Sequence, residues 1–391
     1  MAQRANPGGQ LGIGQILGRD ELIRTIWEIL DNQSVMMTAE RRIGKTSIIR
    51  KMQAVPPEGW VPVLQDLEQF HSANEFATAV YGEVSAFVSK KANVLQQLRS
   101  AWDALGGTEI GGVLKLPDGD KQSWKTLLTT TVANLVANQE DKKLLFLWDE
   151  MPYMLDSICK RESVEQAIDI LDVLRALRHQ HNNAFRMLVT GLIGLHHVIK
   201  RLQDEQYTNR PFNDVYSVEV TPLSSSYGEL LARELIEGES LACRDMDESA
   251  AVMAAEGDYF GFYIHHIARR LKMSGQDAEP EAIRSCVQEQ LLDPNDPWEL
   301  RHFRERLPLY YPSDETIVLT ILDSIASSDE AISVKDLLQA IKQQILFDDR
   351  EQLRRLLALL EQDHYLKRDM EGRYQFRFPL ICRWWRLDRG L

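Results

Sequence analysis

The sequence predicts an α/β fold: a mostly parallel sheet with helices on both faces, then a helical segment and a small C-terminal domain. Three observations predict this. An apolar run precedes the Gly-Lys-Thr at 44–46, and a helical pattern follows it. Two further apolar runs, 144–148 and 187–189, end in polar residues, as buried parallel strands do. After residue 222 helical patterns replace the strands. The order of these segments indicates a three-layer domain with additions at its C-terminal side.

The N-terminal region contains one clear helix. Apolar residues between Asp20 and Leu30 recur with a helical period, so this stretch is predicted to be an amphipathic helix. Residues 1–15 are rich in glycine, and we expect them to be poorly ordered. The N-terminus has no apolar core of the kind that a signal peptide carries.

The most informative stretch is residues 39–46, Ala-Glu-Arg-Arg-Ile-Gly-Lys-Thr. Its last three residues match the end of the phosphate-binding loop pattern G-x-x-x-x-G-K-[ST]. Gly44 would let backbone amides approach a phosphate. Lys45 would place its charge on the β- and γ-phosphate oxygens, and the Thr46 hydroxyl suits a Mg²⁺ ligand. Because a Gly-Lys-Thr also recurs by chance, the context matters.

That context favours a nucleotide. Residues 34–38 are predicted to form a buried strand, and residues 47–52 a helix whose N-terminus faces the anion. Ala39 departs from the pattern, because it stands in place of the first glycine. Its methyl group crowds the loop without removing a ligand, so it bears on turnover more than on binding.

A second motif follows the predicted strand 142–148, which is covered on both faces. Asp149 at its end would hold Mg²⁺, and Glu150 would polarise the attacking water. The alternative is a buried strand that ends in a solvated acidic turn. The third piece is the strand 185–191, where Thr190 would sense the γ-phosphate or position water; alternatively it belongs to a turn without a role.

The remaining strands of the sheet are predicted at 61–67 and 216–220. The stretch from about 70 to 140 is longer than a plain crossover between parallel strands needs, and Gly106-Gly107, Gly111-Gly112 and the segment 116–120 interrupt it. We interpret it as a helical insertion that contacts a partner or decorates the core.

Helices are predicted from 223 to about 292, beginning with a capping box in which Ser226 is the N-cap and Glu229 the third helical residue. Prolines at 294, 297, 308 and 312 mark a linker. Between 312 and 391 three helices (315–325, 334–345 and 350–361) and two strands (365–368 and 373–378) predict a winged helix-turn-helix, a domain that binds DNA or protein.

The net charge argues against a protein that coats nucleic acid non-specifically. The 391 residues include 45 basic and 58 acidic ones, a net charge of −13, whereas phosphate neutralisation needs clustered Lys and Arg. The Arg383-Trp384-Trp385-Arg386 stretch is either part of a basic, aromatic surface or core packing.

No apolar run reaches 18 residues, so no membrane span is predicted. Four scattered cysteines and two pairs of adjacent histidines predict neither disulfides nor a metal cluster, and the expected location is the cytoplasm.

Gly18-Arg19-Asp20-Glu21, the loop 41–47 and Leu147-Trp148-Asp149-Glu150 together resemble the archaeal-type ATPases, P-loop proteins of the STAND and AAA+ kind. The resemblance implies a P-loop ATPase domain at 1–222, a helical lid at 223–300 and the winged helix at 312–391. It implies ATP rather than GTP, and a nucleotide state that controls the lid, the winged helix or an assembly. Such ATPases serve signalling, host-defence or mobile-element systems.

The resemblance and the motifs together give a set of site residues. The expected catalytic residues are Lys45, Glu150 and Arg210, the last as an arginine finger that reaches a neighbouring subunit or as a plain surface residue. Mg²⁺ would be held by Thr46 and Asp149. The expected nucleotide-binding residues are Gly18, Arg19, Ala39, Glu40, Arg41, Arg42, Ile43, Gly44, Lys45, Thr46, Ser47 and Thr190. Arg269 or Arg270 of the lid would reach the γ-phosphate, unless both are surface residues.

The function that these residues predict is an ATP-binding, Mg²⁺-dependent, ATP-hydrolysing switch with a protein partner or self-assembly. Two other functions stay open. One is a DNA-binding initiator or loader, like archaeal origin-recognition proteins, that uses the winged helix as its main contact. The other is a nucleotide-bound scaffold that does not turn over, which Ala39 keeps open.

Overall fold

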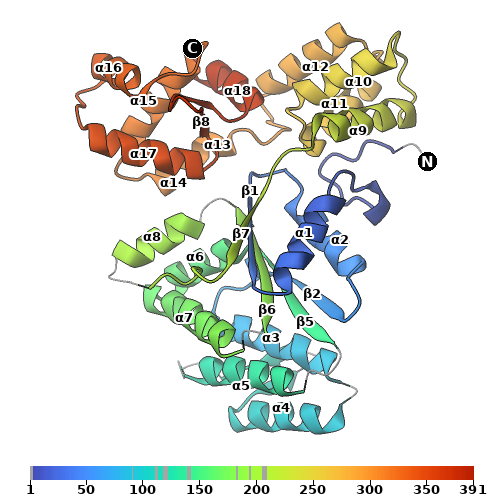
Figure 1. The fold of residues 1–391 in the computed structure, drawn as a ribbon, viewed down its shortest axis with the longest axis vertical. Coiled ribbons are helices and arrows are strands. Elements are labelled where there is room, and N and C mark those ends of the chain that lie inside the picture. Colours follow the sequence, from blue (N-terminus) through green and yellow to red (C-terminus); the bar gives the residue numbers. More distant parts are fainter. Residues whose placement is uncertain are drawn as a thin grey trace. The chain divides into compact units, whose positions relative to one another are not determined.

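The computed structural model describes residues 3–89, 91–110, 113–117, 122–138, 142–181, 184–192, 195–204 and 209–391 (Figure 1). The chain divides into two compact units. Unit 1 consists of Met1–Gly18, Glu40–Gly44 and Thr221–Leu391, and unit 2 of Arg19–Ala39 and Lys45–Val220. The predicted phosphate-binding loop is thus shared: residues 40–44 belong to unit 1, while Ala39 and Lys45 belong to unit 2.

Unit 2 is built on a five-stranded sheet in the order β2-β5-β6-β1-β7, and all its neighbouring strands run parallel. The strands are β1 (Val35–Ala39), β2 (Trp60–Asp66), β5 (Lys143–Asp149), β6 (Arg186–Leu192) and β7 (Tyr216–Val220). The register of β2 and β5 runs from Trp60 opposite Lys143 to Asp66 opposite Asp149. The prediction of a mostly parallel α/β sheet is confirmed.

The helices of unit 2 are α1 (Asp20–Leu30), α2 (Lys45–Ala54), α3 (Ala73–Phe87), α4 (Ala92–Ala104), α5 (Ser123–Ala137), α6 (Met151–Arg161), α7 (Val164–Gln180), α8 (Leu195–Asp204) and the 3₁₀ turn Leu67–Gln69. A small hairpin pairs β3 (Thr108–Ile110) with β4 (Val113–Lys115). Figure 1 shows α6 and α7 on one side of the sheet and α1 and α2 on the other. The sheet is therefore the middle of three layers.

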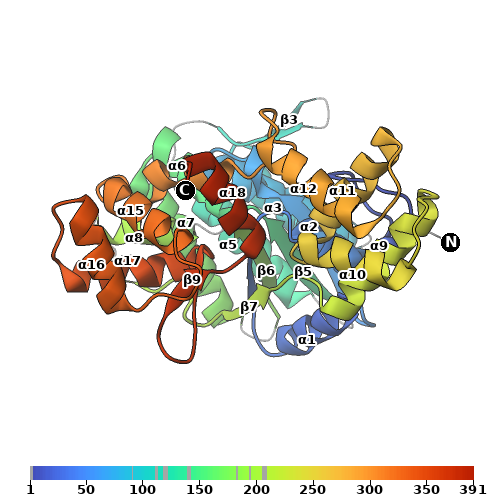
Figure 2. The same cartoon turned by 90° about the horizontal axis from the view of Figure 1, so that it is seen from above.

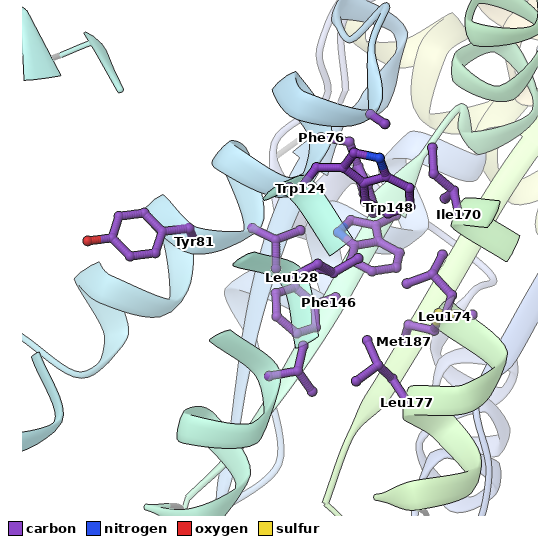
Figure 3. Close-up of a cluster of buried hydrophobic side chains, with 14 of the residues drawn as sticks. Phe76, Tyr81, Trp124, Leu128, Phe146, Trp148, Ile170, Leu174, Leu177 and Met187 are labelled. Carbon is purple, nitrogen blue, oxygen red and sulfur yellow. The ribbon is translucent and has the colours of Figure 1, made fainter. Parts of the chain in front are cut away.

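One face of the sheet carries a large apolar core. Phe146 and Trp148 of β5 and Met187 of β6 lie between α5 and α7 (Figure 3). Leu145 and Leu147 are fully buried but lie outside this cluster, as expected for side chains that alternate between the two faces of a strand.

The stretch from 70 to 140 contributes to that core. The helices α3, α4 and α5 supply buried side chains to it, including Phe76, Trp102 and Trp124. Trp124 also donates its indole N–H to Gln166 Oε1 of α7 at 3.1 Å, which satisfies its polar group in the interior. This segment is therefore part of the packed unit. The glycine pair 111–112 and the residues 118–120 lie outside the described residues.

Unit 1 begins with the N-terminal chain. The amide of Ala5 donates to Glu239 Oε1 at 2.8 Å, and the amide of Asn6 donates to His265 Nδ1 at 3.2 Å. Ala5 and Ile16 are buried. Residues 3–6 are therefore anchored within unit 1, contrary to the expectation of poor order, while residues 7–15 are half-buried or exposed. The glycine-rich composition suggested disorder. Composition does not reveal the few side chains and backbone amides that anchor the segment.

Four helices follow: α9 (Ser225–Gly238), α10 (Met246–Glu256), α11 (Gly261–Ser274) and α12 (Pro280–Leu292). The predicted N-cap of the first helix is wrong by two residues. Ser224 has extended dihedral angles and its hydroxyl accepts a hydrogen bond from the amide of Tyr227, whereas Ser226 lies within the first turn. Three consecutive serines made the sequence pattern ambiguous, and the backbone conformation selects the first of them.

The C-terminal part contains α13 (His302–Glu305), α14 (Leu307–Tyr310), α15 (Glu315–Ala326), α16 (Val334–Gln344), α17 (Arg350–Gln362), the antiparallel strands β8 (Leu366–Arg368) and β9 (Tyr374–Phe376), and α18 (Pro379–Arg389). The helices α15–α18 and the β8–β9 loop appear together in Figure 2. The last helix was not predicted. It begins at Pro379, and proline is favoured in the first turn of a helix. Trp384 and Trp385 are buried, so their role is core packing.

The helix α18 is tied to the loop after α10 by a carboxylate. Asp258 Oδ2 accepts the amide of Leu380 at 2.7 Å, and Arg383 pairs with Glu256 at 2.6 Å. Burial raises the pKa of Asp258 from 3.8 to about 7, against the hydrogen bond from Leu380 and the charge of Arg383, which both lower it.

This raised pKa predicts a pH-dependent stability. Because the folded state binds the Asp258 proton more tightly than the unfolded state, the stabilisation is complete below the unfolded pKa of 3.8 and is lost as the pH rises through about 7. Asp258→Asn, which stays neutral, is expected to be more stable than the parent at pH 8 by about 1–3 kcal/mol and to match it near pH 4. Urea unfolding at several pH values measures this. Asp245→Asn, which removes the charge of the exposed N-cap of α10, is the control. An advantage of Asp258→Asn that does not grow with pH contradicts the prediction.

Within the described residues, no helix combines the length and apolar character that a membrane crossing requires. All four cysteines are present as free thiols.

Candidate functional site

Residues on three elements of unit 2 converge at the carboxyl end of the sheet. The Thr46 hydroxyl of α2 donates to Asp149 Oδ2 at 2.9 Å, and the Thr190 hydroxyl of β6 donates to Asp149 Oδ1. Asp149 is the last residue of β5, the neighbour of β6 in the sheet. Parallel strands end at one edge, which is why distant residues meet here. The predicted grouping of Thr46, Asp149 and Thr190 is therefore present in the structure.

The oxygen donors at this point suit Mg²⁺. The ion prefers hard oxygen ligands and keeps several waters, so it needs only one or two protein groups besides substrate phosphates. The Thr46 hydroxyl and the Asp149 carboxylate supply two such groups within hydrogen-bond distance of each other. Thr46 is exposed while Asp149 is buried, so the pair has one side toward solvent. No group of three or more His, Cys, Asp or Glu side chains with metal-binding geometry occurs in the described part of the chain.

Lys45 begins α2 and is buried, with only 7% of its surface exposed. Its Nζ donates to the carbonyl of Ala39, at the end of β1, at 3.2 Å. The ammonium group therefore folds back over the end of β1. Ser47 follows in the first turn of the same helix and is half-buried.

Ala39 does not need to be a glycine. It is the last residue of β1, in register with Leu192 and Val220, and it is not among the residues with a positive φ. A glycine is required where φ is positive or where another group comes too close for a Cβ. In contrast, Gly44 has a φ of 102°. The departure from the expected motif therefore falls at a position where an L-residue is unstrained.

Glu150 lies directly after Asp149 and has left-handed dihedral angles, with φ 56° and ψ 37°. Its carbonyl accepts hydrogen bonds from the amides of Tyr153 and Met154 and so starts α6. A non-glycine residue in this region is uncommon and such strain concentrates at functional positions. Glu150 is half-buried whereas Asp149 is buried, so the two adjacent carboxylates differ in their access to water.

The loop residues of unit 1 are anchored by residues far along the chain. Glu40 is 1% exposed, and its Oε1 lies 3.3 Å from Arg306 Nη1 and 3.7 Å from His302 Nε2. The same oxygen accepts the amide of Arg41 at 2.8 Å. Burial by itself would raise the pKa of Glu40, but Arg306 and His302 outweigh it and lower the pKa to about 2. Glu40 is therefore a charged, buried loop residue.

The two arginines of the loop share one partner. Arg42 contacts Glu299 through Nη2, and Arg41 Nη2 lies 2.9 Å from the same carboxylate. The Arg42 guanidinium also lies over the Phe262 ring, 4.7 Å from its centre, and its backbone is left-handed with a φ of 64°. Ile43 is buried. The side chains of residues 40–43 are thus all held by other parts of unit 1.

The local packing around Gly18 and Arg19 explains why these two residue types occur there. Gly18 has a φ of 65°, and a Cβ added there would lie 2.7 Å from the Tyr227 ring of α9. Arg19 is buried, which lowers the pKa of its guanidinium to about 10 and leaves it charged at neutral pH. The structure therefore gives both residues a packing environment, while a part in nucleotide binding stays a prediction.

Arg210 and Arg269 are both exposed. The segment after Arg210 is held by Arg178 of α7, which is only 4% exposed, contacts the carbonyl of Pro211 and pairs with Asp214 at 2.8 Å. Of the predicted segment 207–211, Tyr207 and Thr208 lie outside the described residues. No local pattern points to Arg178, Glu299, His302 or Arg306, because the charged residues with which they pair lie 36 to 266 positions away.

Comparisons of sequence alone found no family model and no curated protein that matches the chain. Comparison of structures found clear likenesses. The Walker-type ATPase paby2304 of Pyrococcus abyssi aligns over 95% of this chain and 96% of its own, with a TM-score of 0.63 and 14% identity. The ORC2 protein of Aeropyrum pernix, solved as ADPNP–ADP complexes, aligns over 96% of each chain, with a TM-score of 0.51 and 12% identity. The parallel sheet, the strand-end residues and these likenesses together show that the chain has the fold of P-loop NTPases.

Proposed function

We propose that the protein binds ATP and hydrolyses it with Mg²⁺, and that its nucleotide state acts as a switch. The observation that carries this is the grouping of Thr46, Asp149 and Thr190 at the strand ends, directly after the Gly-Lys-Thr sequence. A structural role alone does not explain why the hydroxyl of an exposed threonine, a buried carboxylate and a second hydroxyl meet at the edge where parallel α/β sheets bind ligands.

The proposed roles follow from position and chemistry. Lys45 would exchange its bond to the Ala39 carbonyl for phosphate oxygens, and the backbone amides around Gly44 would approach the phosphates. Thr46 and Asp149 would hold Mg²⁺, which when bound neutralises developing charge on the phosphates. Glu150 would orient and polarise water, and Thr190 would fix the Asp149 carboxylate through its hydrogen bond. Catalysis by this site is positioning plus charge neutralisation.

The test is calorimetric titration of the purified protein with ATP, ADP and GTP in the presence and absence of Mg²⁺, followed by phosphate release. Binding of ATP that strengthens with Mg²⁺ supports the proposal. Absence of binding at millimolar ATP would contradict it. Release of phosphate separates the switch from a nucleotide-bound scaffold. Ala39 has no positive φ, which supports turnover over such a scaffold.

The C-terminal domain, with helices α15–α18 and the β8–β9 hairpin, is proposed to be a winged helix that contacts a protein partner. The alternative, a DNA contact, is weakened by the pairing of the basic residues near the C-terminus. Arg373 pairs with Asp369, Arg383 with Glu256 and Arg389 with Asp323. Lys367 and Arg368 of β8 are exposed. A DNA titration at several salt concentrations discriminates the two: phosphate contacts give a steep salt dependence.

Self-assembly is proposed through Arg210, which is exposed on a segment that Arg178 holds in place. An arginine finger acts only if subunits pack head to tail, so ATP-dependent oligomers with heterologous contacts are implied. A cytoplasmic location and a role in signalling, host defence or a mobile element belong to the same proposal and rest on fold-level analogy.

A mixing experiment tests the role of Arg210. Arg210→Ala and Lys45→Ala are each expected to have lost ATPase activity, because one lacks the finger and the other the phosphate ligand. Mixing them is expected to restore part of the activity at shared interfaces. The exposed Arg269→Ala serves as the surface-arginine control. An Arg210→Ala protein with full activity, or a protein that stays monomeric with saturating ATP and Mg²⁺, excludes action across subunits.

A further inference from the structure

The predicted phosphate-binding loop carries a negative charge of its own. Glu40 is its second residue and is ionised, although a carboxylate beside a polyphosphate is repelled by it. The carboxylate is also removed from water, with 1% of its surface exposed. A buried charge needs a partner of opposite sign, so the partner of Glu40 decides whether this loop tolerates an anion.

That partner is Arg306, in the segment between α13 and α14. Its guanidinium is buried and uses each of its three nitrogens: Nη1 toward Glu40 Oε1 at 3.3 Å, Nε toward the Tyr365 hydroxyl at 2.6 Å, and Nη2 toward the carbonyl of Asp363 at 3.1 Å. The charged group also lies over the Tyr365 ring, 4.3 Å from its centre. One side chain thus joins the loop to the turn before β8.

The Tyr365 hydroxyl is held in turn. It donates to the carbonyl of Phe303, and the Tyr311 hydroxyl donates to Asp363 Oδ2. These contacts make a continuous buried network from Glu40 to the C-terminal domain, all within unit 1. On the other side of the loop, Glu299 binds Arg41 and Arg42. Charged side chains of the loop therefore contact the segment 299–306 at two places.

We infer that Arg306 is a positioning residue of the phosphate-binding loop, which neutralises and fixes Glu40 and couples nucleotide affinity to the packing around Tyr365. The inference rests on the proposed function. A phosphate-binding loop uses its backbone amides toward the ligand, so its side chains are available as anchors. Whatever displaces Arg306 leaves an uncompensated carboxylate in the loop and frees its backbone, and both effects weaken anion binding.

The coupling is reciprocal. If the packing of Tyr365 and Asp363 on Arg306 favours the nucleotide-binding loop conformation, then nucleotide must favour that packing by the same free energy. A partner that binds the C-terminal domain and disturbs this turn would lower nucleotide affinity without contact to the site. The position of the network gives the proposed switch a route between nucleotide and partner.

The experiment measures affinity for a fluorescent ADP analogue in the full chain. Arg306→Met is expected to weaken binding by about tenfold or more, which is about 1.4 kcal/mol. Arg304→Met is the matched control, since Arg304 lies two residues away and only pairs with Asp388 at 3.4 Å on the surface. Glu40→Gln in the Arg306→Met background is expected to restore affinity, because it removes the carboxylate that Arg306 neutralised. A double-mutant cycle over Glu40 and Arg306 separates the effect of their interaction on ADP affinity from a general loss of stability.

Two milder variants keep the inference testable if Arg306→Met does not fold. Tyr365→Phe removes only the hydroxyl that binds Arg306, and Arg306→Lys keeps the charge. Tyr365→Phe is expected to weaken ADP binding by about threefold and to reduce the thermal shift that ADP produces, and Arg306→Lys is expected to retain more affinity than Arg306→Met. A Tyr365→Phe protein that binds ADP as tightly as the parent and shows the parent's thermal shift overturns the inference. If the parent itself binds no nucleotide, it is the proposed function that fails.

Discussion

Lys45→Ala is expected to lower ATP affinity by about 100-fold or more, which corresponds to about 2.7 kcal/mol. The ammonium group is the one side-chain charge at the start of α2, where the helix N-terminus and the amides of the loop already favour an anion. Calorimetric titration with Mg²⁺ and ATP measures the loss. The folded state is expected to survive, because the hydrogen bond to the Ala39 carbonyl that the variant gives up is worth only about 1 kcal/mol.

The matched control is Lys51→Ala, on the same helix. Lys51 pairs with Asp20 of α1 at 2.7 Å, so Lys51→Ala also removes one positive charge and one polar contact. Lys51 lies more than a turn further along α2 than Lys45, away from the phosphate-binding loop. We expect its ATP affinity to stay within about twofold of the parent. A Lys45→Ala protein whose affinity lies in that same range rules out the phosphate-binding role of this loop.

The strands and the first site residues were accessible from the sequence because local patterns determine them. Buried parallel strands are continuous apolar runs, and polar residues at their ends meet at one edge of the sheet. Asp149 and Thr190 were each predicted at the end of a buried strand, and the structure brings them together because β5 and β6 are neighbours in the sheet. Helix α1 was predicted at its observed bounds, Asp20–Leu30, because its apolar side chains follow a helical period without interruption.

The anchoring of the loop was not accessible in this way. Glu40 and Arg306 are 266 positions apart, and an isolated glutamate in a phosphate-binding loop looks like a variable position. The ion pair of Arg178 and Asp214 could not be predicted either, because the two residues are 36 positions apart. Long-range ion pairs leave no periodicity, so they become visible only in three dimensions. The packing of residues 3–6 was hidden for a related reason, since single amides and small side chains hold them.

Glu150→Gln is expected to leave ATP binding within about twofold of the parent and to lower hydrolysis by about 100-fold, a typical contribution of a positioned acid or base. Glutamine keeps the size of the side chain and its ability to orient water, but it does not accept a proton. The left-handed backbone at Glu150 makes a smaller substitution less informative, because alanine or glycine would also change the turn into α6. Phosphate release under single-turnover conditions separates chemistry from product release.

The control for this variant is Asp156→Asn, which neutralises another carboxylate of α6, one that pairs with Lys160 at 2.6 Å. It is expected to bind and hydrolyse ATP at nearly the parent rate. Because Asp149, and not Glu150, makes the hydrogen bonds to Thr46 and Thr190, Glu150→Gln leaves the proposed Mg²⁺ ligands in place. Loss of turnover with retained Mg²⁺-dependent binding therefore assigns water activation to Glu150. Hydrolysis at the parent rate makes it a carboxylate that only starts a helix, and the water would have to be oriented by another group at the strand ends.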